Sequence, residues 1–348
     1  MTAIRVIVTD DSSTVRSLIS RMLRAHTDIE VISTADDGVI AVAQAKKLQP
    51  DIMLLDIEMP NMDGLTALPL ILEASPHTKV IIASTLTARN ANISLKALQL
   101  GAADYLQKPN LEHVDRLERF HHQLTYKIRA LGTCEQQEQP FVQQHVNNAF
   151  SSSLSPVPKA VAIAASTGGP IAITQLAKQL AGKLTHLPVF ITQHMPATFT
   201  GIFADNINEA GGMHCKEAQH DEVVQPGMMY LAPGDYHMRV SKRKGMCHIQ
   251  LGQDAPVNYC RPAADPMILS LTEHYGAELL LIVLTGMGKD GLNGATILHQ
   301  AGGSIISQDK ATSAVWGMPK AVYDANISSA VLPLDDIAPY ILTLCYPL

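Results

Sequence analysis

The sequence predicts an α/β protein of two doubly wound domains. Its 348 residues are enough for two domains of ordinary size. Short apolar runs alternate with segments of helical periodicity along both halves of the chain, which is typical of parallel sheets covered by helices. Between the halves, residues 134–159 are rich in Gln, Asn, Ser and Pro and lack that alternation. We therefore predict one domain at residues 1–125, a linker at 126–159 and a second domain at 160–348.

The first domain is expected to hold a five-stranded parallel sheet of the flavodoxin-like kind. Helical segments such as 13–26 and 38–48 separate its apolar runs, and five β-α units place helices on both faces of the sheet. The predicted strands are residues 5–10, 30–36, 51–56, 79–85 and 104–109.

The second domain is expected to hold a Rossmann-like, mostly parallel sheet. Residues 237–242 and 247–252 follow each other closely, so these two segments are candidates for an antiparallel hairpin. The other predicted strands are residues 160–166, 188–194, 228–234, 279–286, 303–309 and 328–333.

Composition excludes several classes of protein. The net charge is −6 and no Lys/Arg cluster stands out, which argues against nucleic acid as the main partner. The longest apolar runs are too short to cross a bilayer, and the first residues resemble a strand more than a signal peptide. The cysteines are scattered, which predicts free thiols in a reducing cytoplasm. They are Cys134, Cys215, Cys247, Cys260 and Cys345.

Three acids follow predicted strands of the first domain. Asp10 and Asp11 come after the first strand, and Asp56 ends the third. The carboxyl ends of parallel strands share one edge of a sheet, where ligands bind. A single acid at such a position commonly caps a helix, but three carboxylates gathered there suit a hard cation such as Mg²⁺.

The segments TDDS, LLDIEMPNMDG, IAST and YLQKP resemble the phosphoacceptor receiver domain of two-component response regulators. The resemblance covers residues 1 to about 125. It implies that Asp56 is the phosphorylated residue and that Asp10 and Asp11 hold Mg²⁺ together with it. Phosphorylation adds charge and strong acceptor oxygens, which can reposition a loop and an adjoining surface.

A lysine and a hydroxyl group lie at the ends of two further strands. Lys108 precedes Pro109 at the end of the fifth strand, where its charge offsets that of the acids. Ser84 or Thr85 ends the fourth strand. The resemblance implies that Lys108 contacts the phosphoryl group and that one of the two hydroxyls is the switch residue; we prefer Ser84.

The second domain begins with the stretch VAIAASTGGP at residues 161–170. In one interpretation Ser166 or Thr167 simply caps the following helix. In the other, A-A-S-T-G is a variant of the G-x-S-x-G nucleophile elbow, with Ala164 in place of the first glycine. The two glycines would then let backbone and substrate approach closely, and the helix would direct free N–H groups towards Ser166.

A histidine and an aspartate occupy equivalent positions after two other strands. His194 ends the strand PVFITQH, and Asp290 lies in the glycine-rich loop that follows LLLIVL. Taken singly, His194 could be a packed histidine beside Met195. Asp290 could be a turn residue, because KDG is a turn signal. A serine nucleophile needs a base, and the base needs an orienting acid, so together with Ser166 these residues favour a catalytic triad.

This domain resembles the catalytic domain of CheB-type chemotaxis protein-glutamate methylesterase/glutaminases. The matching segments span about 160 to 335: IAASTGGP, TQHMP, YLAPGDYHM, VNYCRPAADPM, LTGMGKDG and ISQD with AVWGMPKAV. The resemblance implies that Ser166 is the nucleophile, His194 the general base and Asp290 its orienting acid.

Further site residues are implied by the same segments. Thr167 and Met287 would line the site, with their backbone amides as candidates for the oxyanion hole. Arg261 is a candidate for holding the substrate, although an arginine that caps a helix fits equally well. Two positions depart from the family pattern: Ala164 and Asp235 stand where glycine is frequent.

The resemblance implies a cytoplasmic, phosphorylation-activated serine hydrolase with Mg²⁺ as the receiver's cofactor and none for the esterase. It would demethylate γ-glutamyl methyl esters and deamidate glutamines on methyl-accepting chemotaxis receptors, with a chemotaxis histidine kinase as phosphodonor. The competing hypothesis is a non-catalytic response regulator with a nucleotide- or protein-binding output domain, in which STGGP cradles a phosphate. The missing G-x-G-x-x-G pattern argues against it.

The polar linker predicts how the receiver controls the esterase. A flexible linker transmits no signal by rigidity, so the receiver is expected to act by covering the opening near Ser166 until Asp56 is phosphorylated. Residues 150–348 alone should then demethylate receptor membranes faster than the unphosphorylated full-length protein. Equal rates of methanol release would instead favour direct activation by the receiver.

Overall fold

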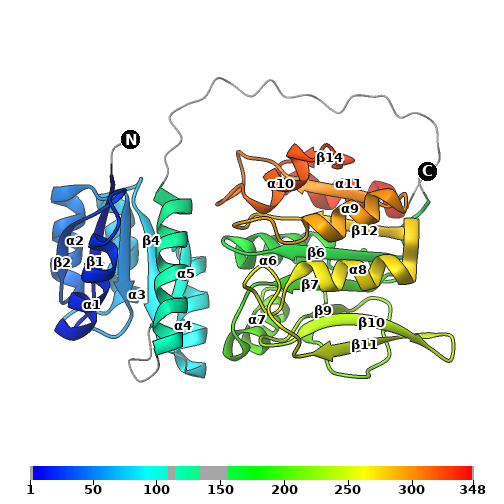
Figure 1. Cartoon of the computed structure of the whole chain (residues 1–348), viewed down its shortest axis with the longest axis horizontal. Helices are drawn as coiled ribbons and strands as arrows, with labels where there is room; N and C mark the ends of the chain where they lie inside the picture. The colour runs from blue at the N-terminus through cyan, green and yellow to red at the C-terminus, as the bar shows by residue number, and fades with distance from the viewer. Residues whose placement is uncertain (1–2, 86, 109–113, 133–155, 347–348) are drawn as a thin grey trace. The chain divides into compact units, whose positions relative to one another are not determined.

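The computed structural model describes residues 3–85, 87–108, 114–132 and 156–346, which fold as two compact α/β units (Figure 1). Strands and helices alternate regularly in the first unit. Its elements are β1 Ile4–Thr9, α1 Ser13–Arg24, β2 Ile29–Ala35, α2 Gly38–Leu48, β3 Ile52–Asp56, α3 Gly64–Ala74, β4 Lys79–Ser84, α4 Ala88–Gln99, β5 Asp104–Gln107 and α5 Val114–Gly132.

The five strands of the first unit form one parallel sheet in the order β2-β1-β3-β4-β5. This is the predicted flavodoxin-like order. Every residue of β3 is buried, which explains why its sequence is a continuous apolar run without alternation. The helices α2, α3 and α4 pack in succession, whereas α5 contacts β1, β3 and β5.

Side-chain caps fix the starts of four helices in this unit. Ser12, Asp37, Asp63 and Thr87 each accept a hydrogen bond from the backbone N–H three residues further on. Such caps satisfy N–H groups that have no partner within the helix. They therefore define where the chain turns at the carboxyl edge of the sheet.

The last helix of the first unit extends beyond the expected domain end. α5 continues to Gly132, so its final turns occupy residues that the sequence analysis assigned to the linker. The apolar spacing of FHHQLTYKIRAL in this helix buries Phe120, Leu124 and Ile128. Most of the expected linker, residues 133–155, lies outside the described residues.

The second unit has a longer succession of elements. They are β6 Ala160–Ala165, α6 Gly169–Leu180, β7 Val189–Gln193, α7 Ala197–Glu209, β8 Cys215–Glu217, β9 Met229–Leu231, β10 His237–Arg243, β11 Met246–Gly252, α8 Ala264–Tyr275, the 3₁₀ helix η1 Gly276–Glu278, β12 Leu279–Val283, α9 Leu292–Gln300, β13 Ser304–Gln308, α10 Met318–Asp324, β14 Ala330–Leu332 and α11 Leu334–Cys345.

Seven of these strands form a parallel sheet in the order β14-β13-β12-β6-β7-β9-β8. β10 and β11 form a separate antiparallel hairpin that packs against α8 (Figure 1). The predicted Rossmann-like sheet and the hairpin are thus both confirmed. The edge strand β8 was not predicted, because its three residues, Cys-Lys-Glu, carry no β-branched side chain.

The centre of the second sheet is packed from small side chains. β6 reads AVAIAA and is completely buried between β7 and β12. The helices form two groups by contact, α8 with α9 and α10, and α6 with α7 and α11, as expected for the two faces of a doubly wound sheet. Alanines in β6 let helices of both groups approach its backbone.

Four of the predicted free thiols are described, and all four are unpaired cysteines. They are Cys215, Cys247, Cys260 and Cys345, whereas Cys134 lies outside the described residues. Among the helices that the structure describes, none is long and apolar enough to cross a membrane.

Candidate functional site

Three carboxylates gather at the carboxyl edge of the first sheet. Asp10 and Asp11 directly follow β1, and Asp56 ends the neighbouring strand β3. One oxygen from each residue lies within 4.8 Å of the others. Asp10 and Asp56 are buried, whereas Asp11 is exposed. The cluster offers the oxygen-only ligand set that Mg²⁺ prefers.

Lys108 bridges two of these acids. Its Nζ lies 2.8 Å from Asp10 Oδ2 and 2.7 Å from Asp56 Oδ2. Within the described part of the chain, this ammonium is the only donor that reaches the two buried oxygens. One positive charge facing three carboxylates leaves a net negative site, so the residues present fit a divalent cation.

The protonation of this cluster follows from burial. Burial raises the pKa of Asp56 to about 6, although Lys108 opposes the shift. Burial also disfavours charge on Lys108, but the two carboxylates outweigh it and raise the pKa of Lys108. The ammonium therefore stays charged at neutral pH, while Asp56 is ionised at a cost to the folded state.

The two candidate switch hydroxyls differ in their surroundings. Ser84 is the last residue of β4 and is buried, next to Ala83, which pairs with Asp56 across the sheet. Thr85 is exposed, and its hydroxyl accepts a hydrogen bond of 2.6 Å from the Asn90 side chain. These positions support the preference for Ser84.

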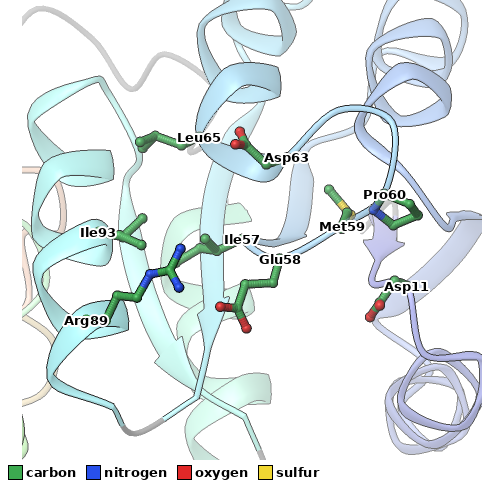
Figure 2. A pocket seen from close by; sticks show the side chains of 9 residues that line it. All are labelled: Asp11, Ile57, Glu58, Met59, Pro60, Asp63, Leu65, Arg89 and Ile93. Atoms are coloured by element: carbon green, nitrogen blue, oxygen red, sulfur yellow. The ribbon is translucent and has the colours of Figure 1, made fainter.

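An open cavity of about 500 Å³ adjoins the acidic cluster (Figure 2). It is bordered by Asp11, by Glu58 and Asp63 in the segment after β3, and by Arg89 in α4. Figure 2 shows the Arg89 guanidinium directed across the cavity towards the side on which Glu58 lies. Asp11 borders this cavity and also belongs to the cluster, so the cavity reaches the exposed member of the three acids.

His194 and Asp290 come together at the carboxyl edge of the second sheet. His194 directly follows β7, and Asp290 lies in the loop between β12 and α9. His194 Nε2 is 2.7 Å from Asp290 Oδ2. The histidine side chain is 13% exposed and the aspartate side chain 2%. The two residues that were predicted to pair from their topological positions do so.

Asp290 accepts hydrogen bonds from several further donors. Ala264 N–H donates to Oδ2 at 2.6 Å, and Asn258 Nδ2 and Gly291 N–H donate to Oδ1 at 3.0 Å each. Burial opposes ionisation, but His194 and these donors outweigh it and hold the pKa of Asp290 below its usual value. Asp290 is thus an ionised and fixed partner for the imidazole.

Asn258 and Asp265 form a second layer behind Asp290 that the sequence analysis did not identify. The Asn258 amide also donates to Asp265 Oδ2 at 3.2 Å, so it bridges two carboxylates. Both residues lie within the segment VNYCRPAADPM, which had been noted only for its resemblance. Asn258 lies in a turn, so no hydrophobic periodicity in the sequence could indicate its role.

Cys260 is a further neighbour of the imidazole that the sequence did not indicate. Its Sγ lies 3.4 Å from His194 Nδ1, on the nitrogen opposite Asp290. Burial disfavours charge on His194, but the Cys260 sulfur and Asp290 outweigh it and raise the pKa of the ring. The ring is thus held between a carboxylate on Nε2 and a thiol on Nδ1.

Ser166 lies one residue beyond β6, next to the end of β7. The strands pair Ala165 with Gln193, and His194 N–H donates to Ala165 O at 3.1 Å, so Ser166 and His194 leave adjacent strands at the same level. Of the described residues, none is hydrogen bonded to the Ser166 hydroxyl. The backbone of Ser166 therefore starts beside that of His194, and of the three predicted residues the described hydrogen bonds join His194 to Asp290.

The glycines around Ser166 are required by close packing. A Cβ on Gly169 would lie 2.0 Å from the Gln193 side chain, and Gly168 has φ +77 and would meet Ala314 at 2.6 Å. Gly286 is equally constrained, because its Cβ would lie 2.8 Å from that of Ser166. Gly168 and Gly169 were expected to let substrate approach closely; contacts within the protein already account for both.

Thr167 and Met287, the two candidates for the oxyanion hole, both adjoin Ser166. Thr167 follows it in the chain, and its carbonyl accepts a hydrogen bond of 2.9 Å from Thr285. Met287 follows Gly286, whose backbone packs on Ser166. Among the described residues, no backbone carbonyl accepts from Met287 N–H.

Arg261 is held by contacts within its own unit. Its Nε and Nη2 lie 3.0 and 2.5 Å from Asp235 Oδ1, and its Nη1 donates to the carbonyls of Gln253 and Asp254. These bonds favour a structural anchor over either of the predicted roles. They also explain Asp235, which adopts φ +67 where glycine is usual, because it is the partner of Arg261.

Comparison with known proteins agrees with this architecture. Residues 6–118 match the response regulator receiver domain, and residues 161–341 match the CheB methylesterase family. A protein-glutamate methylesterase/protein-glutamine glutaminase of Azospirillum brasilense is 44% identical over 97% of this chain and 92% of its own length. Another, of Paramagnetospirillum magneticum, is 41% identical over 98% and 96%.

Among solved structures, the CheB methylesterase catalytic domain of Thermotoga maritima matches with a TM-score of 0.52. It is 35% identical and covers 54% of this chain and 98% of its own. A receiver domain together with a unit that matches the CheB methylesterase family defines a response regulator with an enzymatic output domain. The chain belongs to the CheB methylesterase family, which confirms the resemblance seen in the sequence.

Replacing Asp56 by Asn should stabilise the first unit at neutral and alkaline pH. Folding raises the pKa of Asp56 from 3.8 to about 6, so ionisation is disfavoured in the folded state. The wild-type penalty is therefore absent below about pH 4, grows between pH 4 and 6 and is complete above pH 6. We expect Asp56→Asn to raise the free energy of unfolding by about 1–3 kcal/mol at pH 8.

Denaturant unfolding of both proteins at pH 4, 6 and 8, in a chelating buffer, measures this difference. Asp51→Asn is the matched control, because that residue lies at the opposite end of β3. A stability gain that does not depend on pH would contradict the assignment to Asp56 ionisation.

Proposed function

We propose that Ser166, His194 and Asp290 carry out the methylesterase and glutaminase reactions of this family. The chain is a chemotaxis methylesterase/glutaminase regulated by phosphorylation, as its relatives and its two domains indicate. The observation that carries the residue assignment is the partly buried 2.7 Å contact of His194 with Asp290 beside the Ser166 turn. No comparison supports a nucleotide-binding output domain.

The orientation of the imidazole defines the path of the proton. Asp290 occupies Nε2, so Nδ1 is the nitrogen that accepts the proton of Ser166. The serine oxygen then attacks the carbonyl carbon of a γ-glutamyl methyl ester. When the C–O bond to the methoxy group breaks, His194 returns the proton and methanol leaves. Deamidation follows the same steps with ammonia as the leaving group.

The second half of the reaction uses the same residues. His194 takes a proton from water, the resulting hydroxide attacks the acyl-enzyme, and the proton returns to Ser166 as the glutamate carboxylate leaves. Both tetrahedral intermediates carry a negative oxygen. The Met287 and Thr167 N–H groups adjoin Ser166 and are our candidates for stabilising it.

We further propose that Asp56 accepts the phosphoryl group. Asp10, Asp11 and Asp56 would hold Mg²⁺, which neutralises negative charge on the group being transferred. Lys108 already contacts Asp56 and would bind the phosphoryl oxygens, and Ser84 would supply the switch hydroxyl. A cytoplasmic histidine kinase is the donor, and the cytoplasmic helices of methyl-accepting chemotaxis receptors are the substrate.

Single substitutions test the triad. Ser166→Ala, His194→Ala and Asp290→Ala should each lower kcat for methanol release from methylated receptor membranes by about 10³–10⁶-fold. Because the residues act as a unit, Ser166→Ala combined with His194→Ala should be little slower than Ser166→Ala alone. Losses that simply multiply would contradict a concerted triad, and circular dichroism checks the fold of each variant.

Substitution of Asp56 tests the switch separately. Asp56→Asn should take up no phosphate from the kinase with Mg²⁺ present, and it should keep its basal esterase activity without stimulation. Asp63→Asn is a control, because Asp63 caps α3 outside the acidic cluster. Undiminished phosphate incorporation in Asp56→Asn would place the phosphoacceptor elsewhere.

A further inference from the structure

The pairing of β6 with β7 ends one residue before the proposed nucleophile. Ala165 and Gln193 are the last paired residues, and His194 N–H donates to Ala165 O at 3.1 Å. Ser166 therefore lies beyond the paired part of β7. On the other side, Ser166 N–H donates to Thr285 O at 3.1 Å, just after β12. The sheet backbone thus holds Ser166 from the side of β12, and the side of β7 needs a different contact.

The side chain of Gln193 supplies that contact. Its Nε2 donates to Ser166 O at 2.9 Å and to His194 O at 3.2 Å. Two carbonyl oxygens beside one end of the amide identify that end as the NH₂ group, which has two hydrogens to donate. One side chain at the end of β7 thus binds the backbone of the proposed nucleophile and that of the proposed base.

The amide of Gln193 is confined at its oxygen end as well. Its Oε1 lies against Gly169, where an added Cβ would come within 2.0 Å of it, and the residue is 2% exposed. Gly169 N–H donates to Ser166 O at 2.8 Å, so this carbonyl accepts from both neighbours. The Gln193 amide, the Ser166 carbonyl and the first turn of α6 therefore pack as one unit.

Glutamine is an unfavourable residue in a strand that is buried on both faces. All five residues of β7 are buried, whereas glutamine is mostly exposed in proteins. Among the described residues, Gln193 Oε1 has no hydrogen-bond partner, and a buried polar atom without a partner opposes folding. An amide that is satisfied at only one end is expected where it serves function more than stability.

We infer that Gln193 is a positioning residue that holds the Ser166 turn and the His194 backbone at the separation that proton transfer requires. The inference rests on the proposed function of Ser166, His194 and Asp290. Transfer of a proton from a hydroxyl to an imidazole needs the two groups in hydrogen-bond contact. A misplacement of about 1 Å can lower the rate by about 10²-fold. Gln193 acts through the two backbones that it binds and is not itself a reacting group.

The test uses the full-length protein with Mg²⁺ and a phosphodonor, and it measures methanol release over a range of concentrations of methylated receptor membranes. Gln193→Met keeps the size of the side chain and removes both N–H groups. Asn208→Leu is the matched control. The Asn208 amide also makes two hydrogen bonds, both to the Cys215 backbone at 2.8 Å. It serves the edge strand β8, which β7 and β9 separate from β6.

We expect the loss of rate to be separate from the loss of stability. Gln193→Met should lower kcat by about 10–10²-fold and leave KM within about twofold of the parent value. Both variants should lower Tm, because each leaves backbone groups without their partners. Asn208→Leu should nevertheless keep the parent kcat. The rates are compared at a temperature at which circular dichroism shows every variant to be folded.

Gln193→Glu gives a second readout that does not depend on the methionine variant. The introduced carboxyl group has the shape of the amide. When ionised it faces two carbonyl oxygens and repels them, whereas in its protonated form it can donate to one of them. The kcat of this variant, divided by that of the parent, should therefore rise as the pH falls from about 8 to about 6.

Three results would overturn the inference. The first is a Gln193→Met variant whose kcat falls no further than that of Asn208→Leu, and the second is an effect confined to KM. The third is a kcat ratio for Gln193→Glu that stays constant with pH. Failure of the proposed function is recognised separately, because Ser166→Ala, assayed in parallel, would then still release methanol.

Discussion

The buried carboxylate of Asp290 is the constraint around which the catalytic unit is organised. An ionised group with 2% exposure must be surrounded by donors, or folding would be opposed by its lost hydration. Those donors come from separate parts of the chain: His194 after β7, the Asn258 turn, the first N–H groups of α8, and its own loop after β12. Satisfying one charge thus holds three loops and a helix start in register, and the orientation of the imidazole is a product of that arrangement.

The receiver unit also places buried carboxylates at the carboxyl edge of a parallel sheet, but it surrounds them with fewer hydrogen-bond donors. Asp10 and Asp56 are as buried as Asp290, but they share one ammonium, that of Lys108, and Asp10 accepts one further hydrogen bond, from Ser12 N–H at 3.0 Å. The raised pKa of Asp56 and the lowered pKa of Asp290 record this difference. A carboxylate whose oxygens all have hydrogen-bond donors is suited to fix the orientation of an imidazole. A group of carboxylates with fewer donors than acceptor oxygens is suited to bind a cation and to accept a phosphoryl group.

Much of this could be predicted because parallel sheets convert sequence order into spatial proximity. Residues at strand ends, such as Asp56, Lys108, His194 and Asp290, were expected to converge, and the described contacts join them in pairs. Contacts made from turns could not be predicted in this way. The Asn258 turn depends on left-handed backbone angles, and neither hydrophobic periodicity nor spacing reports which atoms such a turn points inward. The role of Arg261 was open for the same reason, since its partner Asp235 lies in another turn.

The thiol of Cys260 occupies the nitrogen of the His194 imidazole that the proposed reaction uses. With Cys260 on Nδ1, the imidazole is already engaged on both nitrogens, so the nitrogen that we propose for Ser166 is occupied. In the proposed reaction, the Ser166 hydroxyl takes the place of this thiol beside Nδ1 before the proton is transferred.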